Sequence, residues 1–150
     1  MIVKVLMLAV LCTAIAASCA ARFSKSPGNL GVTQGKLAVC PASPNCVSSQ
    51  AEDEVHRVSP LSLSGSAPEA MAALVLVVDA TPGVTVVTHT DNYLHAEYRS
   101  RMFRFVDDLE VFIDEEEQMI HFRSASRMGY SDLGVNRRRV EALKGALSST

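Results

Sequence analysis

The chain has 150 residues, of which 20% are charged, with a formal net charge of −2 and a pI near 6.1. So small a net charge creates no field that would attract nucleic acid, and the composition argues against nucleic-acid binding. Removal of an export signal would leave about 130 residues, enough for one domain with a sizeable core.

The first 19 residues have the pattern of a secretory signal peptide. Lys4 precedes an apolar run over residues 5–17 that only Thr13 interrupts, too short to span a bilayer but typical of the hydrophobic part of a signal. The string AASCAA (16–21) is similar to a bacterial lipobox with Cys19 as the acylated residue. The sequence therefore predicts an exported protein, anchored in the cell envelope on its periplasmic face through Cys19. A soluble periplasmic or secreted form, or an uncleaved anchor, is the alternative.

Residues 20–36 are small, polar and rich in Gly and Ser, a composition typical of a flexible tether. Residues 37–150 are then expected to form a single folded domain. Its first motif is CPASPNC, with Cys40 and Cys46 around two prolines. In an oxidising compartment these two cysteines favour a disulfide that stabilises by about 2 kcal/mol. A redox pair or a metal site is the alternative, but neither an activating helix N-terminus nor a further set of ligands is visible.

The secondary-structure signals follow the order β-α-β-β-β-β-α. Residues 55–63 form a short edge strand that Pro60 interrupts. A helix begins after Ser66, which has Glu69 three residues later as in a capping box, and it ends before Pro82.

Four strands follow, at 84–90, 93–101, 104–114 and 119–126, with short polar connections that favour antiparallel hairpins. A last helix has its apolar residues, from Val140 to Leu147, on one face. The fold class is α+β, a single domain in which a curved antiparallel sheet packs on helices.

Alternation divides the sheet into two faces. Pairing Ile113 with Ile120 places the apolar rows on a covered face. The opposite face carries His95, Glu97, Arg99, Asp108, Glu110, His121 and Arg123. We interpret it as a solvated surface with cross-strand pairs such as Glu110 with Arg123. The two histidines would act as metal ligands only if they converged with a carboxylate, which this register does not require, so no metal or cofactor is predicted.

One end of the covered face becomes polar, and a buried polar group must find a partner. Three arginines (137–139) also lie in the first turn of the last helix, where the helix dipole favours anions. Internal ion pairs or an anionic ligand would explain this pattern, and Asp132 or Asn136 would cap the helix. The candidate ligand-binding residues are Tyr98, Asp107, Ser124, Ser126, Arg127, Tyr130, Asn136 and Arg137.

Three segments carry a family resemblance: SPNCVSSQ (43–50), YLHAEYRSRMFRFVDDLEVFID (93–114) and IHFRSASRMGYSDLGVNRRRVEAL (120–143). Together they resemble the bacterial and plastid family catalogued as domain of unknown function 1499, over nearly all of residues 40–145. The resemblance implies no established activity, substrate or cofactor. Many members of the family look like lipoproteins or membrane-attached envelope proteins, in agreement with the export signal.

The sequence thus indicates an envelope lipoprotein that binds a small ligand or a protein partner without catalysis. One alternative is a small-molecule hydrolase or other enzyme that uses Asp107, Ser124 and Arg127, although no G-x-S-x-G elbow surrounds the serines. The other is a structural envelope component whose charged sheet face contacts another protein.

Overall fold

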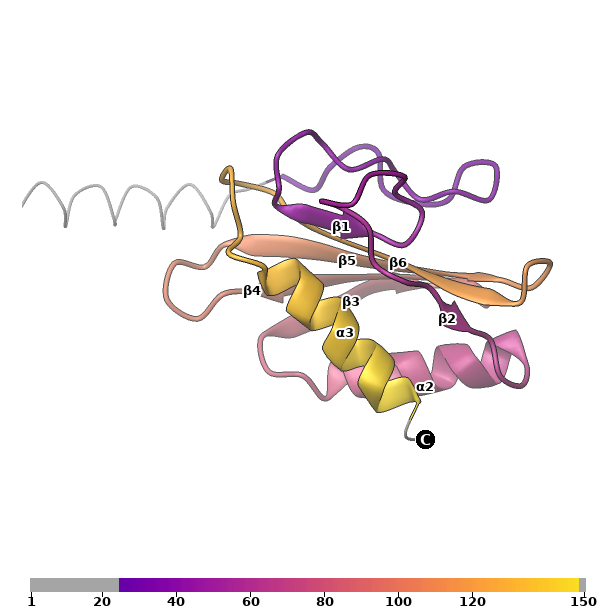
Figure 1. The fold of residues 1–150 in the computed structure, drawn as a ribbon. Coiled ribbons are helices and arrows are strands. Elements are labelled where there is room, and N and C mark those ends of the chain that lie inside the picture. The colour runs from indigo at the N-terminus through magenta and orange to yellow at the C-terminus, as the bar shows by residue number, and fades with distance from the viewer. Residues whose placement is uncertain (1–24, 149–150) are drawn as a thin grey trace, which may run out of the picture.

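The computed structural model describes residues 25–148 (Figure 1). The expected signal peptide, the acylation site Cys19 and the start of the tether lie outside the described residues. Within residues 25–148, no helix is long and apolar enough to cross a membrane.

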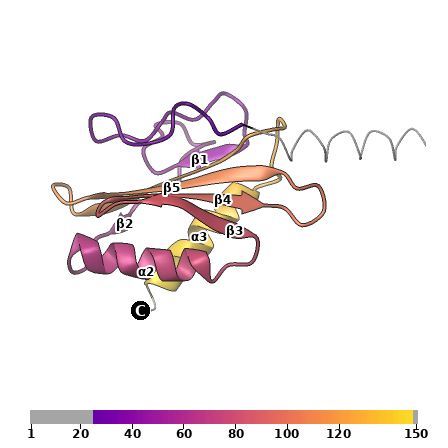
Figure 2. The same cartoon turned by 180° about the vertical axis from the view of Figure 1, so that it is seen from behind.

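Six strands form one antiparallel sheet in the order β1-β6-β5-β4-β3, and β2 pairs separately with β6. The strands are β1 (Cys46–Ser48), β2 (Leu61–Ser62), β3 (Val84–His89), β4 (Tyr93–Arg99), β5 (Val106–Asp114) and β6 (Met119–Ser126). Helices α2 (Ala67–Asp79) and α3 (Val135–Leu147) lie against one face (Figures 1 and 2). The predicted α+β class is confirmed. The edge strand expected at 55–63 is shorter, and β1 was not predicted because three residues are too few to show alternation.

Local sequence signals place both helices. The Ser66 N–H donates to Glu69 Oε2 at 3.0 Å in the expected capping box, with a proline in the first turn. Asp132 caps α3, because its carboxylate accepts from the N–H groups of Gly134 and Asn136 at 3.0 and 2.7 Å. Buried Leu74 of α2 and its neighbours then join the sheet in the core.

The register of the central hairpin is the predicted one. Ile113 pairs with Ile120, and Glu110 lies opposite Arg123. Alternate residues therefore form a helix-facing core, and its fully buried members are Leu74, Val78, Leu94, Ala96, Leu109, Val111, Phe122 and Val140.

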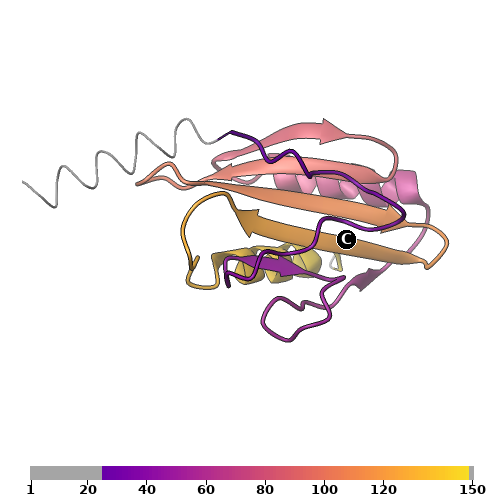
Figure 3. The same ribbon diagram turned by 90° about the horizontal axis from the view of Figure 1, so that it is seen from above.

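The opposite face of the sheet is covered rather than solvated, so the prediction of an open charged surface is wrong. Only 5% of His95, 1% of Asp108 and none of Glu110 is exposed. The chain before β2 folds over this face, as the indigo and purple segments show (Figures 1 and 3). From the stretch expected to be a tether, the Gly31 N–H donates to Glu110 Oε1 at 2.8 Å. The molecule therefore has three layers: loops, sheet and helices.

The Cys40–Cys46 disulfide is formed, as predicted. It closes the loop that leads directly into β1, and Cys46 is paired with Ala125 of β6. The disulfide loop is also tied to the β6–α3 loop, because Asn45 Nδ2 donates to the Gly129 carbonyl at 2.7 Å. The disulfide thus stabilises the edge of the sheet and the cover over its charged face.

Candidate functional site

On the helix-facing side, four of the predicted site residues contact one guanidinium, that of Arg139, and a fifth, Ser126, joins them through Asn136. Arg139 Nη2 donates to Asp107 Oδ2 at 2.6 Å, and its Nη1 donates to Ser124 Oγ at 2.8 Å. The guanidinium carbon lies 4.2 Å from the ring centroid of Tyr98, a cation–π contact. The polar end of the core is therefore satisfied by an internal ion pair.

Asn136 completes this cluster from the start of α3. Its Nδ2 donates to Ser126 Oγ and to the Asn45 carbonyl, both at 3.0 Å, and its Oδ1 accepts from Ser124 Oγ at 2.7 Å. The fully buried amide thus joins the disulfide loop, β6 and α3. Removal of this amide would leave several buried groups unpaired.

The other three predicted residues lie elsewhere. Arg127 is on the covered outer face of the sheet, away from Asp107 and Ser124, so the expectation that these three act together is wrong. Arg137 donates to the carbonyls of Arg57 and Val55 at 2.6 and 2.8 Å and fixes the loop before β2. Tyr130 is 76% exposed. The position of Arg127 follows from alternation, because β6 and the residue after it place neighbouring side chains on opposite faces of the sheet.

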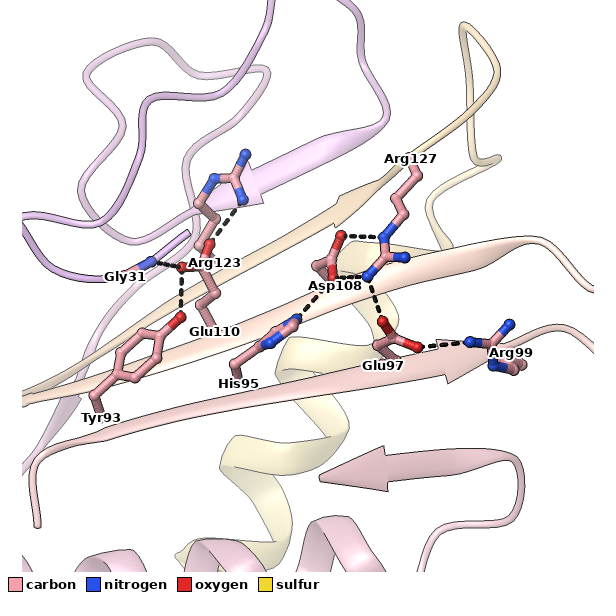
Figure 4. A network of polar contacts seen from close by, with 9 residues as sticks. All are labelled: Gly31, Tyr93, His95, Glu97, Arg99, Asp108, Glu110, Arg123 and Arg127. Carbon is pink, nitrogen blue, oxygen red and sulfur yellow. Dashed lines mark hydrogen bonds and ion pairs between the residues drawn. The ribbon is translucent and has the colours of Figure 1, made fainter. Parts of the chain in front are cut away.

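Figure 4 shows the network that fills the outer face. Asp108 is held by two elements: Arg127 Nε donates to its Oδ2 at 2.8 Å, and His95 Nε2 lies 2.7 Å from its Oδ1. Arg127 Nη2 also donates to Glu97 Oε1 at 2.6 Å, and Glu97 Oε2 accepts from Arg99 at 2.7 Å. Three carboxylate and guanidinium pairs in series thus link β4, β5 and the start of the β6–α3 loop.

A second group of the same network surrounds Glu110. Its Oε1 accepts from the Gly31 N–H and from the Tyr93 hydroxyl at 2.8 and 2.9 Å, and its Oε2 accepts from Arg123 Nη1 at 2.8 Å (Figure 4). Three donors from three segments thus satisfy a fully buried carboxylate. This carboxylate holds the N-terminal segment on the sheet.

The protonation states follow from these contacts. Burial opposes ionisation of Asp108, but hydrogen bonds from Arg127 and His95 outweigh it and hold the Asp108 pKa below its usual range. The hydrogen bond to Asp108 raises the pKa of Arg127, with a smaller contribution from Glu97. Burial, followed by the charge of Glu110, raises the pKa of Tyr93. Asp108 and Arg127 therefore form an ion pair in the neutral pH range, and Tyr93 keeps its hydroxyl proton there.

A cleft opens between α2 and α3 beside the Arg139 cluster. Its volume is about 450 Å³. Its walls are mainly apolar, and Tyr98, Arg138 and Arg139 are among the lining residues. The remaining lining residues are Val77, Thr81, Val135, Ala142 and Leu143. A cleft of this size and composition fits a small, largely apolar ligand.

Exposed apolar side chains gather at the same end of the sheet, in the β4–β5 loop and from the β6–α3 loop into α3. Six of the ten strongly exposed large hydrophobic residues of the described chain lie there. They are Met102, Phe103, Met128, Tyr130, Leu133 and Val135. Arg101 and Arg104 are exposed within the first of these loops. We call this set the loop-end patch.

A nucleophilic site does not follow from the serines of β6. Ser124 is fully buried, donates its hydroxyl proton to Asn136 and accepts from Arg139. Its hydroxyl therefore points at an amide rather than at a general base, the partner that an activated serine requires. His121, the histidine of the same strand, lies on the opposite face of β6.

The profile of the family described as Protein of unknown function (DUF1499) matches residues 36–147. The chain belongs to this family. The DUF1499 match begins just before the disulfide loop and ends at the last residue of α3, so it contains the whole sheet and both helices. It also contains the Arg139 cluster, the Asp108 network and the cleft, whereas Gly31 lies before it. No curated protein matches the chain at a significant level.

The candidate ligand-binding residues omitted Arg139 and Asn45, although Arg139 belongs to the run of arginines for which internal ion pairs were one explanation. Asn136 was a candidate, and the position three residues later lies on the same side of a helix. Nothing in the sequence pointed to Asn45, because its contacts depend on how the disulfide loop packs against β6.

Proposed function

We propose that this DUF1499 protein is an exported envelope lipoprotein, anchored through Cys19, whose domain binds an amphipathic anion without catalysis. The ligand class is an acyl chain that carries an acidic group. The observation that carries the proposal is the apolar cleft between α2 and α3, which two arginines help to line and which shares Val135 with the loop-end patch.

The charge in the cleft favours an anion. Asp107 neutralises Arg139 at 2.6 Å, whereas the Arg138 contact is a hydrogen bond from its Nη1 to the neutral Leu133 carbonyl at 3.0 Å. One positive charge therefore remains beside the cleft for an acidic head group. Arg137 is turned away toward the loop before β2 and takes no part.

The loop-end patch favours a ligand taken from a membrane. Exposed apolar side chains next to arginines are suited to the boundary between acyl chains and anionic head groups. The described chain also begins at this end of the sheet (Figures 1 and 3). A domain anchored through its N-terminal segment would thus present the patch, and the cleft behind it, to the bilayer.

The two other functions are less well supported. A hydrolase that uses Asp107, Ser124 and Arg127 conflicts with the position of Arg127 on the opposite face of the sheet, where it pairs with Asp108. A structural component that contacts a partner through the charged sheet face conflicts with the burial of that face under the N-terminal segment.

Photo-crosslinking tests the ligand. The full chain in lipid nanodiscs is irradiated with a photoreactive palmitic acid, and cross-links are expected on the cleft residues of α2 and α3. Ala142→Trp fills the cleft from an exposed position and is expected to lower the yield at least about fivefold. Ala72→Trp, at an exposed position of α2 outside the cleft lining, is the matched control. Equal labelling of the two variants would refute binding in the cleft.

The anchor has a separate test. Expression of the full chain in a bacterium is expected to yield an N-terminal peptide that begins at an acylated Cys19, identified by mass spectrometry. Cys19→Ser is expected to move the protein from the membrane fraction to the soluble exported fraction. An unmodified Cys19 in the exported protein would contradict the lipoprotein assignment and leave the cleft proposal standing.

A further inference from the structure

The β5–β6 hairpin brings three potential metal ligands together at the end of the sheet opposite the loop-end patch. One side-chain atom each from Asp114, Glu117 and His121 lies within 4.8 Å of the others. The turn creates this arrangement: Asp114 Oδ1 accepts from the N–H groups of Glu116 and Glu117 at 2.9 and 3.0 Å. The chain is thereby folded back so that Glu117 faces His121, four residues later on β6.

His121 has a buried nitrogen without a hydrogen bond. The residue is 6% exposed, and its Nε2 lacks a hydrogen-bond partner within the described chain. The nearest carboxylate oxygen, Glu117 Oε2, is 3.4 Å away, beyond the usual range for an N–H···O bond. Since a buried polar atom without a partner is costly, the nitrogen calls for a further group in this space.

We infer that Asp114, Glu117 and His121 bind a divalent transition-metal ion such as Zn²⁺. A Zn²⁺ ion holds imidazole and carboxylate ligands at about 2.0–2.1 Å, which sets two tetrahedral ligands about 3.4 Å apart. His121 Nε2 and Glu117 Oε2 are 3.4 Å apart, which matches the distance between two ligands of a tetrahedral Zn²⁺ ion. Three protein ligands leave the fourth position for water or an external group.

The surroundings of His121 orient it for this role. Its Nδ1 lies 3.2 Å from Ser49 Oγ, which also accepts the Phe122 N–H at 2.9 Å. With Nδ1 as the donor to Ser49, the Nε2 lone pair points toward the carboxylates. A metal-bound histidine commonly donates its second N–H in this way. The imidazole also stacks on Phe112, with ring centroids 6.2 Å apart, which restricts its rotation.

An ion has access to this site from solvent. Asp114 and Glu117 line an open cleft of about 540 Å³ together with the crossing segment around Gln34. The imidazole favours a transition metal over Ca²⁺ or Mg²⁺, because those ions prefer oxygen ligands alone. The site is independent of the acyl-binding cleft, so either proposal stands if the other fails.

Calorimetric titration with Zn²⁺ tests the inference. The full chain in detergent, with its disulfide intact and after treatment with a chelator, is expected to bind one Zn²⁺. Glu117→Gln is expected to weaken binding at least about tenfold, and its side chain is 65% exposed, so the variant should fold. Glu116→Gln removes the same charge from the same turn outside the ligand set and is expected to change the affinity less than about twofold.

Three results would overturn the site. They are no Zn²⁺ binding to the wild type, equal weakening by Glu116→Gln and Glu117→Gln, and Ca²⁺ binding as tight as Zn²⁺ binding. The second would indicate a diffuse acidic patch, and the third a site without the imidazole. His121→Gln gives an additional check when circular dichroism shows that it folds, because it should abolish one-to-one binding. The exposed His89, changed to Gln, is the control for nonspecific histidine binding.

Discussion

Replacement of Arg123 by Met should expose how strongly the buried charges of the outer face depend on one another. Arg123 is 5% exposed and supplies the only guanidinium hydrogen bond to the fully buried Glu110 among the described residues. Met keeps much of the side-chain length without the charge. Glu110 would retain the donors Gly31 and Tyr93 but lose its counter-charge.

The free energy of unfolding that Arg123→Met should lose can be estimated from the cost of breaking a buried ion pair. Breaking a buried ion pair from one side costs about 3–5 kcal/mol, because an uncompensated charge remains. The two remaining donors to Glu110 place the cost at the lower end, about 3 kcal/mol. With a urea slope of about 2 kcal/mol per molar, the unfolding midpoint should fall by about 1.5 M. This is a large part of the 5–15 kcal/mol that stabilises a typical domain.

Urea denaturation of the wild type, Arg123→Met, Glu110→Gln and the double variant forms a mutant cycle. Each single change should be strongly destabilising, whereas the double variant should lose about 2 kcal/mol less than the sum, since neither charge is left alone. Additive losses would refute the argument. Hydrogen exchange provides an independent readout, because the Gly31 N–H should exchange faster in the double variant as its carboxylate acceptor is lost.

Two further predictions concern the disulfide and the cap of α3. Reduction of the Cys40–Cys46 bond should lower the free energy of unfolding by about 2 kcal/mol, and a melting temperature unchanged by reductant would contradict this. Asp132→Ala should cost about 1 kcal/mol at pH 7. Burial opposes ionisation of Asp132, but hydrogen bonds from the N–H groups of Asn136 and Gly134 outweigh it, so its folded pKa is lowered. Its stabilisation is therefore complete above its unfolded pKa of about 3.9 and is lost as the pH falls through the folded value. Urea midpoints of wild type and variant should converge as the pH falls below the folded pKa of Asp132, and a constant gap would contradict the ionic cap.

The sheet and helices were predictable because each is specified locally. The Ile113–Ile120 register followed from alternation across a short turn, and α2 followed from Ser66, Glu69 and the apolar spacing between them and Pro82. The disulfide was predictable because, in a protein expected to be exported, Cys40 and Cys46 favour a disulfide. The hairpin register and α2 were decided by residues close in sequence, and the disulfide was decided by the number of cysteines.

The covered outer face was not predictable from the same rules. A row of charged residues on alternate positions has the same pattern whether water or a protein segment lies over it. The difference is made by Gly31, 79 residues away from its acceptor Glu110, and by pairs such as Arg127 with Asp108 that cancel the cost of burial. Contacts between such distant segments leave no periodic signal in either one.

The site was predicted in part for the same reason. Alternation correctly placed Tyr98, Asp107 and Ser124 on the helix-facing side, but it did not identify Arg139 as their shared partner. Arg127, one residue after β6, was grouped with the wrong face, although it continues the alternation of Arg123 and Ala125 onto the outer face. His95 meets Asp108 across the β4–β5 pair, whereas His121 meets Glu117 only through the turn at Asp114, which folds Glu117 back onto the sheet.

The hydrogen bond from Gly31 to Glu110 also sets the maximum length of the chain that could link the domain to a membrane anchor. In the proposed anchored form, eleven residues lie between the acylated Cys19 and Gly31, where the chain is fixed to the sheet. Fully extended, they span at most about 40 Å. The tether would therefore keep the domain within about 40 Å of the membrane surface. Any molecule that the domain binds must itself come within that distance of the membrane.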